Sequence, residues 1–250
     1  MFQSVYDYPF LSSSANHLFD VTYGFSTNSG SLSSSAKAAG DPTIAKKVNI
    51  YNQMAQILVG YDTTGSVRRF DADGDLSGGA KIDNAYFVNF SRLLVKDEIK
   101  KGSFSLVLAS SSAASDAFVA GHNLTASNDN QSAFANTMTI SDAGAATSYK
   151  VNSPAGEYGL LTSGSSNVGL IYYQAGIAVL DTDIITGRAN VGHVGAFSAG
   201  FSPSVKHQAV TFDGTVQDAL TGSGDFNSGI TEFRRRVSNV SFNNTTELNS

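Results

Sequence analysis

The stretch VGLIYYQAGIAVLD, residues 168–181, decides the fold expected for this chain. Its apolar residues fall on both faces of any strand that it could form, which is typical of a strand in the middle of a sheet. Gly176 interrupts the run and predicts either a bulge or a short reversal between two strands. Upstream, GEYGLLTS and the turn GSSN, residues 164–167, make this run the second half of an antiparallel hairpin.

Three more segments have strand character. HLFDVTYGFS, residues 17–26, places its apolar side chains on one face with a period of two. AYFVNFSRLLV, residues 85–95, and SFSLVLAS, residues 103–110, flank the charged stretch KDEIKKG and are predicted to pair as a second antiparallel hairpin. A last strand is expected near the end of the sequence, with Phe233, Val237, Val240 and Phe242 as its apolar residues.

One helix is expected, over residues 42–60. Asp41 can cap its N-terminus, Pro42 suits its first turn, and Gly60 stands where a left-handed residue commonly ends a helix. Its apolar residues form one helical stripe that should pack against the sheet formed by 85–95 and 168–180. The stripe comprises Ile44, Val48, Tyr51, Ala55 and Leu58, and the residues expected to face solvent are Lys46, Lys47, Asn49, Asn52 and Gln53.

The segments 1–16, 26–41 and 110–148 lack periodicity and are long for loops of a compact monomer. Buried loops need partners for their backbone groups, so we expect these segments to contact neighbouring subunits, with one or two short strands in the third. The chain as a whole is predicted to be mainly β: an antiparallel β-sandwich-like architecture with one packed α-helix and long irregular loops. We expect a single domain over 1–250, which could divide into 1–110 and 149–250.

The composition excludes several classes of site and partner. The absence of Cys excludes disulfides, thiolate zinc sites, iron–sulfur clusters and cysteine nucleophiles. The net charge is −5, and the 16 Lys and Arg residues are scattered, which disfavours nucleic acid as a partner. No apolar run reaches the roughly 18 residues of a transmembrane helix, so no membrane partner is expected.

Asp71, Asp73 and Asp75 alternate within FDADGDLSGG, residues 70–79, a pattern that invites comparison with calcium loops. An EF-hand loop requires Gly at its sixth position and Glu at its twelfth, where this chain has Leu and Ile. Two interpretations remain. One is an exposed acidic turn in which a glycine supplies a positive φ; the other is a looser site of oxygen ligands.

The sequence contains no recognisable catalytic motif. GAFSAG, residues 195–200, has Ala196 where the nucleophile elbow requires Gly, and no glycine-rich phosphate loop stands between a strand and a helix. The four histidines show no metal-ligand spacing: His17, His122, His193 and His207. We therefore expect no enzymatic activity and no cofactor, although the paired carboxylates of a glycan hydrolase would leave no sequence signature.

Arg234, Arg235 and Arg236 form the only basic run. On a strand these side chains would project onto both faces. The run has two interpretations: a solvated or edge-blocking strand, or a contact with an acidic neighbouring subunit. We predict that the three arginines and Phe242 are inter-subunit contacts, and that the polar NNTTELNS, residues 243–250, continues in an exposed or partner-bound conformation.

Several of these stretches together resemble virion structural proteins of tailed bacteriophages, typical of marine, contractile-tailed cyanophages. The resemblance covers most of the chain: YDYPFLSSSANHLFDVTYG (6–24), IYNQMAQILVGYDTTGSVRRFDADGD (50–75), AYFVNFSRLLVKDEIKKGSFSLVL (85–108), GLIYYQAGIAVLD (169–181) and RRRVSNVSFNNTTELNS (234–250). In proteins of this type NNTTELNS lies inside the chain, which implies a longer polypeptide.

The resemblance implies a non-enzymatic component of the phage baseplate or tail. Its expected partners are copies of itself and other virion proteins, and its expected location is the virion, after assembly in the host cytoplasm. A receptor- or glycan-binding β-sandwich module of a phage tail is the alternative. In that case exposed tyrosines would be needed, whereas Tyr172 and Tyr173 fall in an apolar strand and are expected in the core or an interface.

Overall fold

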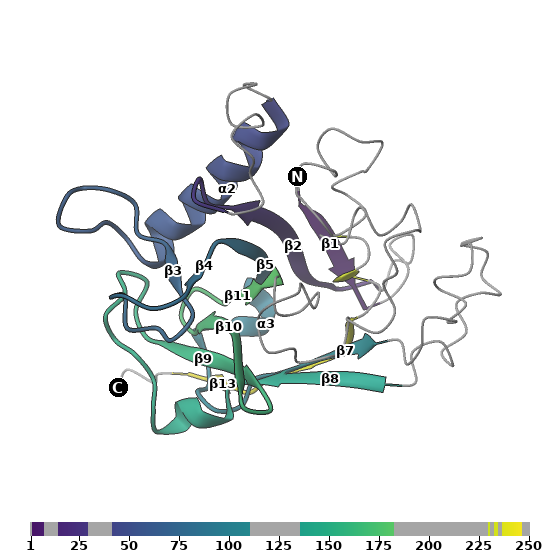
Figure 1. The fold of residues 1–250 in the computed structure, drawn as a ribbon. Coiled ribbons are helices and arrows are strands. Elements are labelled where there is room, and N and C mark those ends of the chain that lie inside the picture. Colours follow the sequence, from purple (N-terminus) through teal and green to yellow (C-terminus); the bar gives the residue numbers. More distant parts are fainter. Residues whose placement is uncertain are drawn as a thin grey trace.

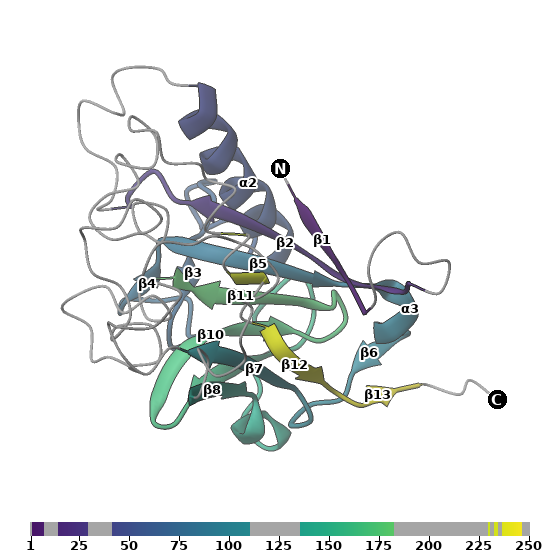
Figure 2. The ribbon, with the colours of Figure 1, turned by 90° about the vertical axis from the view of Figure 1, so that its right-hand side faces the viewer.

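The computed structural model of the protein describes residues 2–7, 15–29, 42–110, 136–182, 230, 233–234 and 237–246. Within them, nine strands form one antiparallel sheet that curls into a half-barrel (Figures 1 and 2). In chain order these strands are β1 (Gln3–Tyr6), β2 (His17–Phe25), β5 (Asn84–Phe90), β7 (Ser105–Ser110), β8 (Asn136–Ser141), β9 (Tyr158–Ser163), β10 (Ser166–Tyr172), β11 (Ile177–Asp181) and β12 (Val237–Ser241). Across the sheet their order is β1, β2, β5, β11, β10, β9, β8, β7 and β12.

The remaining described elements are short, apart from one helix. Helix α2 (Pro42–Leu58) is followed by α3 (Arg92–Val95) and by the single 3-10 turn η3 (Ala143–Ala146). Two-stranded ladders join β3 (Phe70–Asp71) to β4 (Lys81–Ile82) and β6 (Glu98–Ile99) to β13 (Asn244–Thr245). The predicted fold class, mainly antiparallel β with one packed helix, is confirmed.

The central run behaves as predicted. Its two halves are β10 and β11, which lie in the middle of the sheet and pair with each other. Gly176 makes a reversal rather than a bulge: its φ is +66°, and a Cβ there would lie 2.8 Å from the Val95 side chain. One face of these strands, with Ile171 and Leu180, fills the concave core, and the other face, with Val179, lies under α2.

Helix α2 covers the convex face of the sheet (Figure 1). Tyr51, Ala55 and Leu58 are fully buried against Phe87 and the strands β10 and β11, as the helical stripe predicts. The chain leaves the helix through Gly60, whose φ of +74° confirms the expected left-handed end. The side chain of Ile44 and the capping residue Asp41 lie outside the described residues.

The prediction that Lys47 faces solvent is wrong. Its side chain is only 5% exposed, and its Nζ lies 5.9 Å from the centre of the Tyr23 ring. The cause is the close approach of the helix to β2 at Gly24, where an added Cβ would lie 3.0 Å from the Lys47 carbonyl oxygen and 2.9 Å from the Tyr51 nitrogen. Of the other residues expected to face solvent, Asn52 is half-buried and the rest are exposed.

The predicted hairpin between residues 85–95 and 103–110 is wrong. Strand β5 lies between β2 and β11, whereas β7 lies between β8 and β12. The two segments meet face to face across the core, where the Phe90 and Phe104 ring centres are 5.6 Å apart. β5 is buried on both faces and has a strand on each edge, so neither edge is available to β7. The chain therefore continues through α3 and β6 before it forms β7 in another part of the sheet.

The charged stretch KDEIKKG is consequently no hairpin tip. Within it, Ile99 is buried, and Glu98–Ile99 pairs with Asn244–Thr245 near the end of the sequence. The expectation that residues 243–250 are exposed or bound to a partner is therefore wrong for Asn244 and Thr245, which are half-buried and pair within the chain. The Asn244 side chain also donates a 2.7 Å hydrogen bond to the carbonyl oxygen of Leu94.

The last strand begins later than predicted. Phe233 and Arg234 have helical backbone conformation, and the strand itself spans Val237–Ser241. Phe233 nevertheless belongs to the core, with its ring centre 4.8 Å from that of Tyr86. Of the segments without periodicity, 8–14, 30–41 and 111–135 lie outside the described residues, while β8 is a strand expected within 110–148.

Candidate functional site

A groove of about 640 Å³ lies between β1 and β12, the two edge strands of the half-barrel. In Figure 2 these strands stand on opposite sides of the opening of the half-barrel. The apolar side chains that line the groove are Val5, Leu18, Phe19, Phe90, Leu94, Val237, Val240 and Phe242. Polar residues of β12, together with Tyr6, Asp7 and Asn244, complete the lining, so the groove offers both apolar surface and hydrogen-bonding groups.

Among the described residues, both walls of the groove are edge strands of the sheet. In the described part of the chain, β1 has the single strand neighbour β2, and β12 has the single neighbour β7. Such an edge carries backbone N–H and C=O groups that can pair with a strand of another chain. Proteins commonly protect exposed edges with charged residues or proline, and neither QSVY of β1 nor VSNVS of β12 contains one.

Phe242, one of the predicted contact residues, forms part of this groove. It directly follows β12 and is half-buried. Its ring packs edge-on against Phe90, with ring centres 5.4 Å apart, and stacks on Phe104 at 6.4 Å. One side of Phe242 therefore completes the core of its own chain, and the rest of the side chain remains available to a ligand or partner in the groove.

The basic run is only partly described. Arg235 and Arg236 lie outside the described residues, and Arg234 is exposed. Because Arg234 is helical, the expected alternation of the arginines on a strand does not hold for it. Within the described part of the chain, Arg234 forms no ion pair, so its guanidinium is free to meet an acidic group of a partner.

The sequence predicts one wall of the groove, through Phe242, and does not predict the other. Val5 and Tyr6 of β1 belong to the segment 1–16, for which contacts with neighbouring subunits are expected but no strand. Only the order of strands in the sheet shows that β1 and β12 are its two edges and that they face the same opening.

The structure also brings together the three aspartates of the acidic turn. One carboxylate oxygen from each of Asp71, Asp73 and Asp75 lies within 4.8 Å of the other two. Asp73 and Asp75 are exposed, but Asp71 is fully buried, so the interpretation as a simple exposed turn is wrong for Asp71.

His17 is the one histidine among the described residues, and its Nε2 lies 3.0 Å from Oδ1 of Asp20.

A second hollow, of about 520 Å³, is lined by residues that follow β2, by residues of α2 and by the segment between α2 and β3. Its lining is mainly polar and includes Asn28, Asn52, Asp62 and Arg68. Arg69 at its rim is held by two hydrogen bonds to Asp83, at 3.0 and 3.1 Å. Hydroxyl, amide and guanidinium groups gathered in one hollow are suited to a polar ligand such as a sugar.

Comparison with protein-family models, with curated proteins and with solved structures finds no match to this chain. Among the helices that the structure describes, none has the length and apolar character needed to span a bilayer. The observations that bear on function are the groove, the mainly polar hollow and the sequence resemblance.

Proposed function

We propose that the protein is a non-enzymatic structural component of a tailed-bacteriophage virion, acting in the baseplate or tail. The observation that carries this proposal is the groove between β1 and β12, because it combines apolar surface with two edge strands of the described sheet that contain no charged residue or proline. The resemblance of residues 50–75 and 85–108 to virion proteins of contractile-tailed cyanophages supports the same role. The partners are copies of this chain and other virion proteins, and the location is the virion, after assembly in the host cytoplasm.

Assembly at the groove would proceed by strand addition. An extended segment of a neighbouring subunit pairs its backbone with the free edge of β12, and its alternate side chains enter the groove beside Phe242. Backbone hydrogen bonds supply affinity, and the apolar surface supplies specificity. A segment of one copy seated in the groove of the next is a heterologous contact, which produces rings or filaments, the shapes from which tails and baseplates are built.

Light scattering after size-exclusion chromatography, with negative-stain imaging, tests this proposal on the purified chain. We expect rings or polymers for the wild type. Asn239→Lys places a charge on the exposed edge strand β12 and should shift the population toward monomers. Thr139→Lys is the matched control, because it adds the same charge at an exposed position of β8, a strand with neighbours on both sides.

Two results would contradict assembly through the groove: a wild-type chain that stays monomeric at all concentrations, or equal assembly of the Asn239→Lys and wild-type chains. Imaging of the intact particle would identify the neighbours of the subunit directly. A particle that lacks this chain would refute the virion role itself.

The mainly polar hollow favours a second candidate function, a receptor- or glycan-binding module of a phage tail. Its amide, hydroxyl and guanidinium groups match the hydrogen-bonding pattern of sugars. This alternative predicts a well-behaved monomer that binds a glycan array. Asn52→Ala, at the wall of the hollow, should then reduce glycan binding, whereas Asn239→Lys should leave it unchanged.

A further inference from the structure

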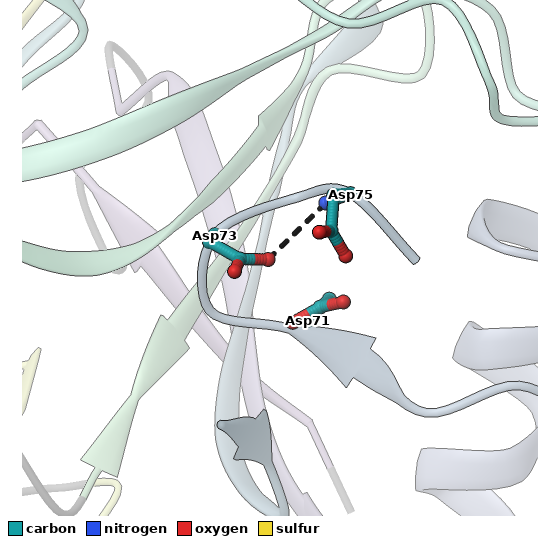
Figure 3. A group of neighbouring side chains, drawn as sticks. All are labelled: Asp71, Asp73 and Asp75. Carbon is teal, nitrogen blue, oxygen red and sulfur yellow. Dashed lines mark hydrogen bonds between the residues drawn. The ribbon is translucent and has the colours of Figure 1, made fainter. Parts of the chain in front are cut away.

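The turn between β3 and β4 collects three carboxylates around one point. Asp71 ends β3 and pairs in register with Lys81 of β4, while Asp73 and Asp75 belong to the turn between them. In Figure 3 the three aspartate side chains point toward a shared space on the inner side of the turn. One oxygen of each lies within 4.8 Å of the other two. Oxygens that bind the same Ca²⁺ at about 2.4 Å can be no farther apart than twice that distance, and these three oxygens meet that condition.

A second observation, independent of the clustering, comes from Asp71. The side chain is fully buried, and its Oδ2 accepts a 2.6 Å hydrogen bond from Nζ of Lys81. Its other oxygen, Oδ1, is buried and has no hydrogen-bond partner among the described residues. Buried polar atoms are nearly always paired, so an unpaired buried carboxylate oxygen indicates a place for a cation, a proton or a water molecule.

The unpaired oxygen is directed into the cluster. A Cβ placed on Gly79 would lie 3.7 Å from Oδ1 of Asp71 and 3.1 Å from Oδ2 of Asp73, so both oxygens approach the same side of the turn. Lys81 does not serve Oδ1: its ammonium group donates to Asp71 Oδ2 and to the carbonyl oxygen of Ser77, 2.5 Å away, and makes no hydrogen bond to Oδ1.

The local charge matches a divalent ion. Three carboxylates beside one ammonium group leave two negative charges uncompensated. A doubly charged cation at Oδ1 would remove the repulsion among the aspartates without displacing Lys81.

The turn is also held in place from outside. The hydroxyl of Tyr158 donates a 2.7 Å hydrogen bond to the carbonyl oxygen of Gly74, and the Asn167 amide donates one of 3.1 Å to that of Ala72. Within the turn, the Ser77 N–H donates to Asp75 Oδ1 at 2.7 Å. A turn fixed in this way loses little conformational freedom when it binds an ion, which favours binding.

We propose that Asp71, Asp73 and Asp75 bind one Ca²⁺ ion, Asp71 through its Oδ1 atom. Water molecules and carbonyl groups of the turn supply the remaining oxygen ligands, because Ca²⁺ takes about six to eight in all. Mg²⁺ demands a near-ideal octahedron and gives up its water reluctantly, so a site made of three side chains from an open turn prefers Ca²⁺.

Titration calorimetry with Ca²⁺ and luminescence of Tb³⁺ bound in place of Ca²⁺ test the proposal. The chain has no Trp, and Tyr158 contacts the turn, so tyrosine excitation should sensitise bound Tb³⁺. We expect one Ca²⁺ per chain, with a Kd of about 1 mM or lower. Asp73→Asn and Asp75→Asn, both at exposed positions, should each weaken binding about tenfold or more.

Asp62→Asn is the matched control. Asp62 is exposed and caps a similar turn, accepting hydrogen bonds from the N–H groups of Thr64 and Ser66 at 2.8 and 2.9 Å, but it is not part of the cluster. It should bind Ca²⁺ like the wild type. Thermal unfolding without calcium verifies that each variant is folded, and added Ca²⁺ should raise the midpoint of the wild type and of Asp62→Asn only.

Three results would overturn the proposal. They are the absence of saturable Ca²⁺ binding by the wild type at pH 7, equal weakening in Asp62→Asn and Asp73→Asn, and binding of Mg²⁺ as tight as that of Ca²⁺. The assembly assays of Asn239→Lys address a different surface, so the failure of one proposal leaves the other standing.

Discussion

The hydroxyl of Tyr173 donates a 2.9 Å hydrogen bond to Oδ2 of Asp142, and both side chains are completely buried. The same carboxylate accepts hydrogen bonds from the N–H groups of Gly102, at 2.8 Å, and Phe104, at 2.9 Å. Asp142 follows β8, Tyr173 follows β10, and Phe104 precedes β7. A single buried carboxylate thus joins three segments of the half-barrel that are far apart in the sequence.

Removal of this hydroxyl should destabilise the fold. Tyr173→Phe leaves Asp142 with one donor fewer in a buried site, and we expect the free energy of unfolding to fall by about 1–3 kcal/mol. Tyr149→Phe is the control, because Tyr149 is 42% exposed. Urea denaturation of both variants measures the difference, and an equal effect of the two substitutions would show that the buried hydrogen bond contributes little.

The helical stripe gives a test of packing on the convex face. Leu58 is fully buried between α2 and the sheet, so Leu58→Ala should lower the free energy of unfolding by about 2–5 kcal/mol. Its neighbour Ile57 is 63% exposed, and Ile57→Ala should change stability by less than about 1 kcal/mol. A denaturation midpoint of Leu58→Ala close to that of the wild type would contradict the observed burial.

Lys47 makes stability depend on pH. Burial lowers the pKa of Lys47 from 10.5 to about 8 in the folded chain. Between these two values the unfolded chain binds more protons than the folded one, so the free energy of unfolding should rise with pH from about 8 to 10, by up to about 3 kcal/mol. Above about pH 10 the buried tyrosines reverse the trend, because burial raises the pKa of Tyr51 and of Tyr173.

Lys47→Met tests this interpretation. The substitution removes the buried ammonium group and should increase stability at pH 7 while flattening the rise between pH 8 and 10. Lys46→Met changes the adjacent, exposed residue and should leave the pH dependence as it is. A rise that persists unchanged in Lys47→Met would assign the pH dependence to another group.

Gly24 sets the distance between α2 and β2. An added Cβ would lie 2.9 Å from the Tyr51 nitrogen and 3.2 Å from the Phe87 ring, so Gly24→Ala must push the helix away from the sheet. We expect a loss of about 1–3 kcal/mol in the free energy of unfolding. Gly144→Ala serves as the control, because a Cβ at Gly144 would have no neighbour within 4 Å. If the two variants unfold at the same denaturant concentration, the contact at Gly24 is not tight in solution.

The basic run remains a prediction about assembly. Replacement of Arg234, Arg235 and Arg236 by Ser should weaken assembly, more strongly at about 50 mM salt than at higher salt, because dissolved ions screen the contact. Lys46→Ser combined with Lys100→Ser removes exposed positive charge elsewhere and should have no effect. Light scattering across a salt series measures both variants. Unchanged assembly of the arginine variant at low salt would assign the run to a solvated surface.

Local patterns were sufficient to predict the type of several elements. The strand over 17–26, the helix over 42–60 and the paired central strands of 168–181 all follow from which side chains are apolar and at what spacing. The burial of Tyr172 and Tyr173 follows from the same pattern. These features are predictable because a period of two or of 3.6 residues is a property of the segment alone.

Partners in space were not predictable in the same way. Residues 85–95 and 103–110 have the pattern of two strands joined by a charged turn, yet Phe90 and Phe104 meet across the core and not along a shared edge. Lys47 has the position of a solvent-facing residue and is buried because Gly24 admits the helix. An apolar pattern predicts that one face of a segment is buried, but it does not predict which other segment covers that face.

The same distinction between local pattern and tertiary contact applies to the two candidate sites. The sequence by itself determined that Asp71, Asp73 and Asp75 share one short segment and that Phe242 lies in a segment of mixed apolar and polar residues. Only the tertiary structure decided that Asp71 is buried with an unpaired oxygen, and that β1 and β12 face one groove. The physical reason is that periodicity along the chain records the burial of each face, whereas burial of a particular atom and the meeting of two sheet edges depend on how distant segments pack around a common core.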